Sequence, residues 1–577
     1  MSTAHVPQQP QPTTPTGAPP EPPIPPHASE ATRLLCAGTY LDPGYRDRVI
    51  EELHLNEQRI VAPSLGFDAA RVLAHALRAR RQELLWAGAV LGLWVVGLPL
   101  SGGLLALLLW PSVTLALAPW IRGRAAQPPL YRLIPAFLVR WWGRLSFAAL
   151  LIFTVVAAFS GGSGDDSSSR SYDPYYGDYP NASDLTDLLT PSLKTWQAWA
   201  VLVVLVLIGL CLHAQRTRFS RALAAELSPQ RFPDAVGDPA EQAENPQFQR
   251  LKQRIRLEQH APLILYNEAR PFCGAGAAYD TWVLAVELRP DESGRRQPLS
   301  NRTVLEKIRP LLEQLRIPAE FAGPGVRDRL RRLEIDECVF LPAEGLLRRD
   351  QAPYTAQAFE EHRARAVEEG AEKRRHFLRI RVGGWEEELV VTVFVRIHTQ
   401  GRMLMLEVAP HVLTPVREDF KDADRSAHRF RHNNRLGKAA TAAVLVPGSL
   451  GRSLAQLFRG LVYVWRLLTG GHAGALPDGP AVSVRELGSA PAGSLFQEMD
   501  VVRYLRSVQD RVANGVRSAL ADSGYETGEF VQKIVNISSD VHIGRVEGST
   551  FAVGSHASAA SVTDGTAPQK GTDSHGK

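Results

Sequence analysis

Residues 84–121 read LLWAGAVLGLWVVGLPLSGGLLALLLWPSVTLALAPWI and contain no charged side chain over 38 consecutive positions. A single straight helix of this length would measure roughly 57 Å, almost twice the ~30 Å hydrocarbon core of a bilayer. Glycine and proline gather in the middle of the run, in GLPLSGG at 97–103, and such a cluster is a turn signal. The run therefore predicts two membrane spans, 84–100 and 102–121, joined as a tight hairpin.

Two further apolar stretches follow, at 145–160 and 196–213. The segment between them, 161–195, is polar and contains six aspartates together with a group of tyrosines at 172–179. None of the four expected spans contains Asp, Glu, Lys or Arg, whereas ion-coupled transporters usually need an ionisable group within the membrane. The sequence therefore predicts four spans and disfavours an ion-coupled transporter. It does not disfavour a channel.

The distribution of arginine predicts the orientation, because cytoplasmic loops carry an excess of Lys and Arg. Arginines flank the spans on one side only, at Arg78, Arg80, Arg81, Arg122, Arg124, Arg132, Arg140, Arg144, Arg216, Arg218 and Arg221. The basic residues of the connections on the other side are only Arg170 and Lys194. We therefore expect a multi-pass protein of the cell membrane with both termini in the cytoplasm. The loop 122–144 would then lie inside, and the acidic, Tyr-rich loop 161–195 outside.

The remaining segments have the composition of soluble protein. Residues 1–30 are rich in proline and are expected to be a disordered tail, and 31–83 are expected to be a cytoplasmic helical region. Residues 214–260 suggest a helical linker. Residues 261–535 mix strand and helix patterns, and 536–577 suggest a flexible Gly/Ser-rich tail.

Three strand candidates in the 261–535 segment follow one another closely, at 377–382, 389–397 and 403–408. Short turns that contain glycine join them, and the odd positions of 389–397 form one apolar face. This pattern is typical of an antiparallel meander. The expected fold is thus an α-helical membrane region of four spans plus a cytoplasmic α+β domain that contains an antiparallel meander.

Motifs of common enzyme classes are missing from the sequence, which has no H-E-x-x-H, G-x-S-x-G or G-x-x-x-x-G-K-[ST]. The net charge of +5 is small for 577 residues, so a nucleic-acid partner is not expected. Asp424, His428 and His432 have the spacing of metal ligands on a helix, but the surrounding arginines would repel a cation. We expect no metal and no cofactor, and the sequence identifies no catalytic residue.

The segment 450–469 is the most distinctive part of the soluble region. Arg452, Arg459 and Arg466 recur every seven residues among mostly apolar neighbours, so they form one narrow stripe on a helix. Such a helix suits the inner membrane interface, where the arginines would contact anionic lipid headgroups. The alternative is a buried core helix whose arginine stripe faces water.

Four short phrases resemble an uncharacterised family of multi-pass membrane proteins from high-GC bacteria. They are LLCA at 34–37, YLDPGYRD at 40–47, VAPS at 61–64 and RPFCGAG at 270–276. The family has no assigned activity, so the resemblance implies a membrane location and transfers no catalytic role.

The end of the chain is separately similar to short β-forming assembly motifs of bacterial signalling proteins, at VHIG 541–544 and FAVG 551–554. The alternative is a flexible tail. The leading hypothesis is a non-enzymatic sensor or scaffold that binds protein partners through its cytoplasmic domain and tail, beside the lipid bilayer itself. A membrane-anchored enzyme with an unrecognised site in 261–535 is the second hypothesis, and a channel or transporter is the third.

Overall fold

The structure is a computed structural model that describes residues 25–63, 66–123, 128–160, 195–242, 245–291, 297–316, 330, 332–369, 371–385, 388–470 and 475–539. The predicted outer loop, except residue 195, and the predicted flexible tail, except 536–539, lie outside these residues. The predicted Pro-rich tail is described only from residue 25, where the turn η1 (Pro26–Ala28) leads into the first helix.

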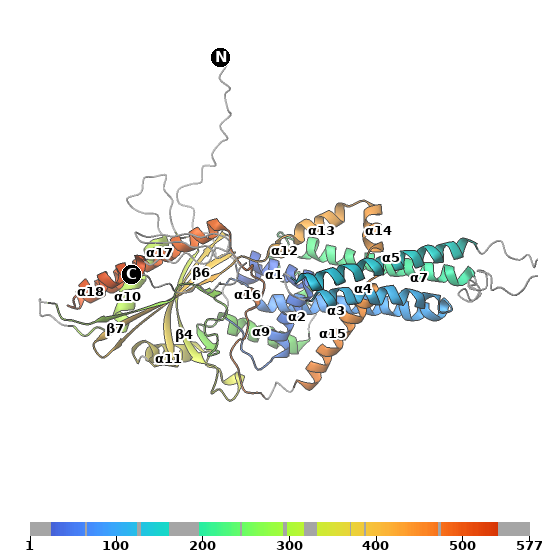
Figure 1. Cartoon of the computed structure of the whole chain (residues 1–577). Coiled ribbons are helices and arrows are strands. Elements are labelled where there is room, and N and C mark those ends of the chain that lie inside the picture. Colours follow the sequence, from blue (N-terminus) through green and yellow to red (C-terminus); the bar gives the residue numbers. More distant parts are fainter. Residues whose placement is uncertain are drawn as a thin grey trace, which may run out of the picture.

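Four long apolar helices form a bundle at one end of the molecule (Figure 1), and their length and composition suit them to cross a membrane. They are α3 (Ala69–Leu100), α4 (Leu109–Arg122), α5 (Leu130–Ser160) and α7 (Thr195–Arg221), and a short 3₁₀ helix, η3 (Leu104–Leu108), precedes α4. The turn between α3 and η3 requires glycine, because Gly102 and Gly103 have φ values of +59° and +87°.

Three of these helices extend beyond the spans expected from the sequence. α3 passes through residue 84 without a break, α5 begins at Leu130 and not at 145, and α7 continues past 213 to Arg221. The expected boundaries follow the first charged residues. Arginine, leucine and alanine are all good helix formers, so a change from apolar to charged residues marks the end of the apolar surface and not the end of the helix.

A helical neck lies between the bundle and the sheet (Figure 1). Its elements are α1 (Glu30–Leu41), α2 (Pro43–Ile50), η2 (Glu51–Leu55), α3 before residue 84, η4 (Ala222–Glu226), α8 (Pro239–Gln242), α9 (Pro246–His260), α12 (Glu418–Lys421) and α16 (Val484–Leu487). One apolar core joins most of them, and Phe420 is buried in it with its ring centroid 5.1 Å from that of Tyr45. The segments that the sequence suggested as a separate helical region and linker therefore share one core.

A mixed seven-stranded sheet forms the other end of the described molecule. Its strands are β1 (Leu263–Tyr266), β2 (Ala277–Ala278), β3 (Trp282–Glu287), β4 (Leu333–Pro342), β5 (Arg375–Gly384), β6 (Leu389–Gln400) and β7 (Met403–Leu413). The order is β1-β4-β5-β6-β7, and both β2 and β3 pair with β7. The pair β1 and β4 is parallel, and the other pairs are antiparallel.

Helices cover one face of the sheet. They are α10 (Asn301–Glu313), α11 (Ala356–Glu368), α17 (Leu495–Asp522) and α18 (Gly528–Ser539), and two single turns, η5 (Gln314–Arg316) and η6 (Arg349–Gln351), lie in the connections. The odd positions of 389–397 are buried in the core beneath these helices. The opposite face has an aromatic cluster that includes Phe340, Phe377 and Phe394.

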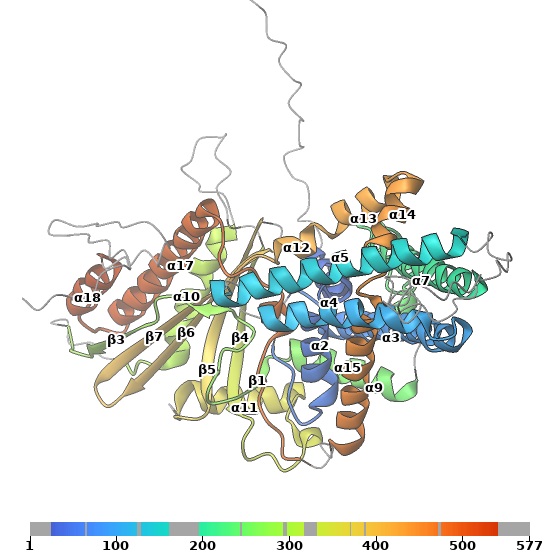
Figure 2. The same cartoon turned by 45° about the vertical axis from the view of Figure 1, so that its right-hand side comes forward.

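After β7 the chain returns to the bundle. α13 (Ala423–His432) and α14 (Arg435–Ala443) lie against α7, whereas α15 (Ser449–Thr469) lies against α3 and α4. Figure 2 shows α15 slanting across the bundle helices. The sequence suggested that 423–469 belong to the 261–535 domain, but in the structure they pack on the bundle and the neck.

Candidate functional site

Small residues seat α15 on the bundle. A Cβ atom on Gly451 would lie 2.4 Å from Ala116 Cβ of α4, and a Cβ atom on Gly460 would lie 2.6 Å from Leu84 Cδ2 of α3. Trp94 Nε1 donates a hydrogen bond to Ser449 Oγ at 3.3 Å. Because these contacts leave no room for larger side chains, the glycines hold the axis of α15 close to α3 and α4.

The face of α15 that points away from the bundle is apolar and exposed. Phe458 is 65% exposed, Trp465 is 66% exposed and Leu468 is 78% exposed, and Leu454, Leu461 and Leu467 lie on the surface as well. Full burial of one such side chain contributes about 1.5–3 kcal/mol. A continuous exposed apolar stripe of this kind is typical of a surface that contacts lipid or another protein.

The three arginines of α15 have different surroundings. Arg459 Nη1 lies 3.8 Å from Asp47 Oδ2, and Arg466 Nη2 lies 2.8 Å from Glu51 Oε1, so both face the neck. Each of these two arginines has nearly half of its side chain in solvent, and such ion pairs contribute at most about 1 kcal/mol. Arg452 instead donates to the backbone carbonyl oxygens of Leu445 and Gly448, the latter at 3.1 Å.

A cavity of about 350 Å³ opens between α3, α7 and α15 where the bundle meets the neck. We call it the base cavity. Its apolar lining includes Trp86, Ala87, Val90 and Leu212, and all of these but Trp86 are buried. The described residues that add polar groups to the lining are Tyr40, Arg46, Glu83, Gln215, Arg216, Ser449, Arg452, Ser453 and Gln456.

The charges around the base cavity do not balance. Arg46 and Glu83 are buried and form an ion pair, and Gln456 Nε2 donates to the second Glu83 oxygen at 2.7 Å. Arg216 and Arg452 remain, and neither lies within 4 Å of a carboxylate among the residues that the structure describes. The cavity therefore combines an apolar wall with an excess of two positive charges.

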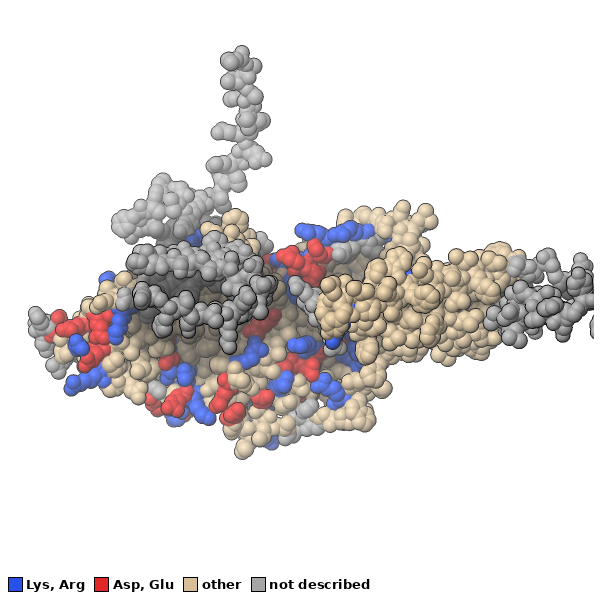
Figure 3. Space-filling model, in the orientation of Figure 1, with Lys and Arg blue, Asp and Glu red and all other residues tan. Residues whose placement is uncertain are grey.

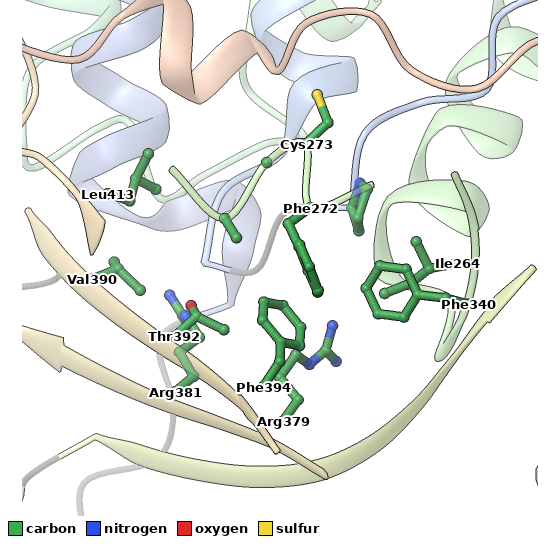
Figure 4. Close-up of a pocket in the computed structure, with 13 residues that line it drawn as sticks. Ile264, Phe272, Cys273, Phe340, Arg379, Arg381, Val390, Thr392, Phe394 and Leu413 are labelled. Atoms are coloured by element: carbon green, nitrogen blue, oxygen red, sulfur yellow. The ribbon is translucent and has the colours of Figure 1, made fainter. Parts of the chain in front are cut away.

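A second, smaller pocket lies on the aromatic face of the sheet (Figure 4). Phe272 reaches into it, and its ring centroid lies 4.7 Å from that of Phe394 and 5.3 Å from that of Phe340. The remaining space is about 40 Å³, which holds only a few water molecules. Arg379 and Arg381 also line the pocket, but they pair with Asp336 and Glu334.

Two cysteines of the sheet domain are buried close to this pocket. Burial raises the pKa of Cys273 to about 12, and nearby Glu486 acts in the same direction. Burial likewise raises the pKa of Cys338 to about 12. Because the thiolate is the reactive form, both thiols are poor nucleophiles at neutral pH.

Close packing and positive φ values explain the two glycines in the loop 270–276. Gly274 and Gly276 have φ values of +101° and +98°, and a Cβ atom on Gly274 would lie 2.2 Å from the carbonyl oxygen of Pro63. Glu486 Oε1 accepts hydrogen bonds from the backbone N of Gly274 at 2.7 Å and of Gly276 at 3.1 Å. Two of the four phrases that resemble the uncharacterised family, at 61–64 and 270–276, therefore contact each other where the neck meets the sheet.

The residues with helical metal-ligand spacing lie on α13. The rings of His428 and His432 have centroids 3.9 Å apart, and His432 Nδ1 lies 3.0 Å from the carbonyl oxygen of His428. Within the described ranges, no group of three or more His, Cys, Asp or Glu side chains could hold a metal ion.

Comparison with known proteins yields a match to a family model. The family described as AbeC-like domain matches residues 281–552, which include most of the sheet, its covering helices and the segment α13 to α15. The four phrases that suggested an uncharacterised family lie outside this match. No curated protein and no solved structure matches the chain.

Proposed function

We propose that this chain is a multi-pass protein of the cell membrane with both termini in the cytoplasm, and that it acts as a non-enzymatic sensor or scaffold through its cytoplasmic sheet domain. The bundle surface visible in Figure 3 has few charged side chains, whereas the sheet domain beside it has many. Arginines such as Arg78, Arg122 and Arg216 lie on the neck side of the apolar spans. This asymmetry supports a neck that faces the cytoplasm.

One observation carries the proposal. α3 and α7 run without a break from the apolar bundle into the neck, where polar contacts, some of them buried, hold them. On α3, Arg71 Nη2 and His75 Nε2 lie 2.8 Å and 3.0 Å from Asp238 Oδ2, and Arg78 Nη1 lies 2.6 Å from Glu226 Oε2 beyond α7. A displacement of either span must therefore move the neck, on which the sheet domain is mounted.

Two further features favour a scaffold over an enzyme. The pocket of the sheet domain in Figure 4 has a volume of about 40 Å³, well below the roughly 300–1,000 Å³ of sites for small organic molecules. The apolar stripe of α15 would lie in the inner leaflet, with Arg452, Arg459 and Arg466 as contacts for anionic headgroups. In that arrangement Arg459 and Arg466 share their charge between lipid and the acidic residues of the neck.

The test perturbs the contact of α3 with α7 and measures the neck. A Cβ atom on Gly97 would lie 2.8 Å from Leu105 and 3.0 Å from Val204, so Gly97→Leu overpacks this crossing. The matched control is Gly92→Leu on the same helix, because a Cβ atom on Gly92 meets nothing within 4 Å.

We expect Gly97→Leu to increase hydrogen exchange in the neck peptides that include α8 and α9, in full-length protein held in lipid nanodiscs, and Gly92→Leu to leave it unchanged. Unchanged exchange in the neck of both variants would contradict coupling between bundle and neck. Reproducible substrate turnover by the purified full chain, abolished by one substitution in the sheet domain, would contradict the non-enzymatic role.

A further inference from the structure

We propose that the base cavity is a discrete binding site for one anionic phospholipid, whose phosphate lies between Arg216 and Arg452. The two arginines come from helices far apart in sequence, α7 and α15, and both line the cavity at its exposed rim. The inference rests on the proposed function in one respect, because it needs the neck end of the bundle to lie at a membrane surface.

The polar rim has the chemistry of a phosphate site. Arginine presents several N–H donors in a planar fork that matches phosphate oxygens. Arg452 is held in place by the carbonyl oxygens of Leu445 and Gly448, so its guanidinium is already oriented before a ligand arrives. Ser453 and Gln215 add neutral polar groups to the same lining.

The carboxylate in the lining does not oppose an anion at this rim. Both oxygens of Glu83 already accept hydrogen bonds, one from Arg46 and one from Gln456. The negative charge of Glu83 is thus matched by the buried Arg46 guanidinium, and the charge offered to a ligand is that of Arg216 and Arg452.

The apolar wall indicates a lipid as the source of the phosphate. Ala87, Val90 and Leu212 belong to the stretches that are apolar enough to cross a membrane, and they form one side of the cavity. The volume of about 350 Å³ lies in the range of sites for small organic groups, which is roughly 300–1,000 Å³. A free phosphate ion would leave this wall without a partner, whereas the glycerol and proximal acyl carbons of a phospholipid would cover it.

The experiment uses the full chain in neutral detergent micelles after removal of endogenous lipid. Binding of a fluorescent phosphatidylglycerol is measured at fixed ionic strength, with unlabelled phosphatidylglycerol, phosphatidylcholine and inorganic phosphate as competitors. The test variant is Arg216→Gln with Arg452→Gln. The control, Arg81→Gln with Arg221→Gln, removes the same charge from exposed positions on α3 and α7 outside the cavity lining.

We expect the test variant to lose about tenfold or more in affinity, because it removes two hydrogen-bonding charges, and the control to change less than about threefold. Ala87→Leu, which fills the cavity and keeps both arginines, should also weaken binding. Only unlabelled phosphatidylglycerol should compete.

An equal loss in test and control variants would overturn the discrete site and leave the membrane topology intact. Competition by inorganic phosphate at similar concentration would overturn the lipid as ligand, and equal competition by phosphatidylcholine would overturn the anionic requirement.

Discussion

Replacement of Asp238 by asparagine tests the buried polar contact that ties α3 to the neck. Arg71 Nε and Nη2 both donate to Asp238 Oδ2, at 3.1 Å and 2.8 Å, and the Arg71 side chain is fully buried. Asp238→Asn keeps the size of the side chain and removes its charge. The buried guanidinium then loses its counterion.

The expected loss of stability follows from that unpaired charge. Removal of one partner of a buried ion pair costs about 3–5 kcal/mol. Arg71 keeps a hydrogen bond to the carbonyl oxygen of His27 at 2.7 Å and lies 3.8 Å from the centre of the Phe232 ring. We therefore expect the lower end of the range, about 3 kcal/mol.

The same contact predicts a pH dependence. Burial alone raises the pKa of Asp238, but the hydrogen bond and charge of His75, together with hydrogen bonds from the Ala240 backbone N–H and Arg71, outweigh burial and hold this pKa well below its ordinary value of 3.8. A carboxyl whose pKa is lower in the folded state stabilises the fold above its unfolded pKa and loses that effect as pH falls. The difference between wild type and Asp238→Asn should therefore be complete at pH 7 and should shrink below about pH 4.

The assay is thermal unfolding of the full chain in detergent, followed by circular dichroism. A loss of about 3 kcal/mol lowers the midpoint by roughly 6–12 °C for a cooperative unit of about 150–250 residues. Asp234→Asn is the control, because Asp234 lies in the same segment and is exposed, and we expect it to cost less than about 0.5 kcal/mol. Equal midpoints for wild type and Asp238→Asn at pH 7 would refute the argument.

Two further predictions concern α15 and the cysteines. Gly460→Leu should detach α15, since the leucine side chain would overlap Leu84. Limited proteolysis should then cleave α15 faster than in the wild type. Gly88→Leu, on the open face of α3, should leave the cleavage rate of α15 at the wild-type value. Cys273 and Cys338 should resist an aromatic disulfide reagent at pH 8 and react fully only after denaturation, because burial raises the pKa of each to about 12. Peptide mapping distinguishes them from the partly buried Cys211, and rapid labelling of Cys273 or Cys338 in the native protein would contradict this expectation.

Much of the fold can be predicted from local patterns. The long apolar runs predict four helices suited to a membrane, because only uncharged stretches of this length can span it. The alternation in 389–397 predicts which face of β6 is buried, because side chains alternate across a strand. Both patterns depend on residues that are neighbours in the sequence.

The arrangement of these elements could not be predicted in the same way. The neck depends on contacts such as Tyr45 with Phe420, which are hundreds of positions apart. The spacing of Arg452, Arg459 and Arg466 predicts one stripe on a helix. Arg459 and Arg466 pair with the neck, whereas Arg452 lines the base cavity, and this difference depends on where α15 packs. From the sequence alone, Arg216 is only a charge that follows the fourth span, because its place in the lining of the base cavity depends on long-range contacts.

Cysteine accessibility in intact cells tests the proposed orientation in the membrane directly. Asp173→Cys lies between the third and fourth spans, and Gly123→Cys lies just after α4. The unmodified chain, whose native cysteines include three buried ones, gives the background labelling. We expect a membrane-impermeant thiol reagent to label Asp173→Cys in intact cells and to label Gly123→Cys only after the membrane is permeabilised, because the proposed orientation places residue 173 outside and residue 123 inside. Labelling of Gly123→Cys in intact cells, with Asp173→Cys protected, would contradict it.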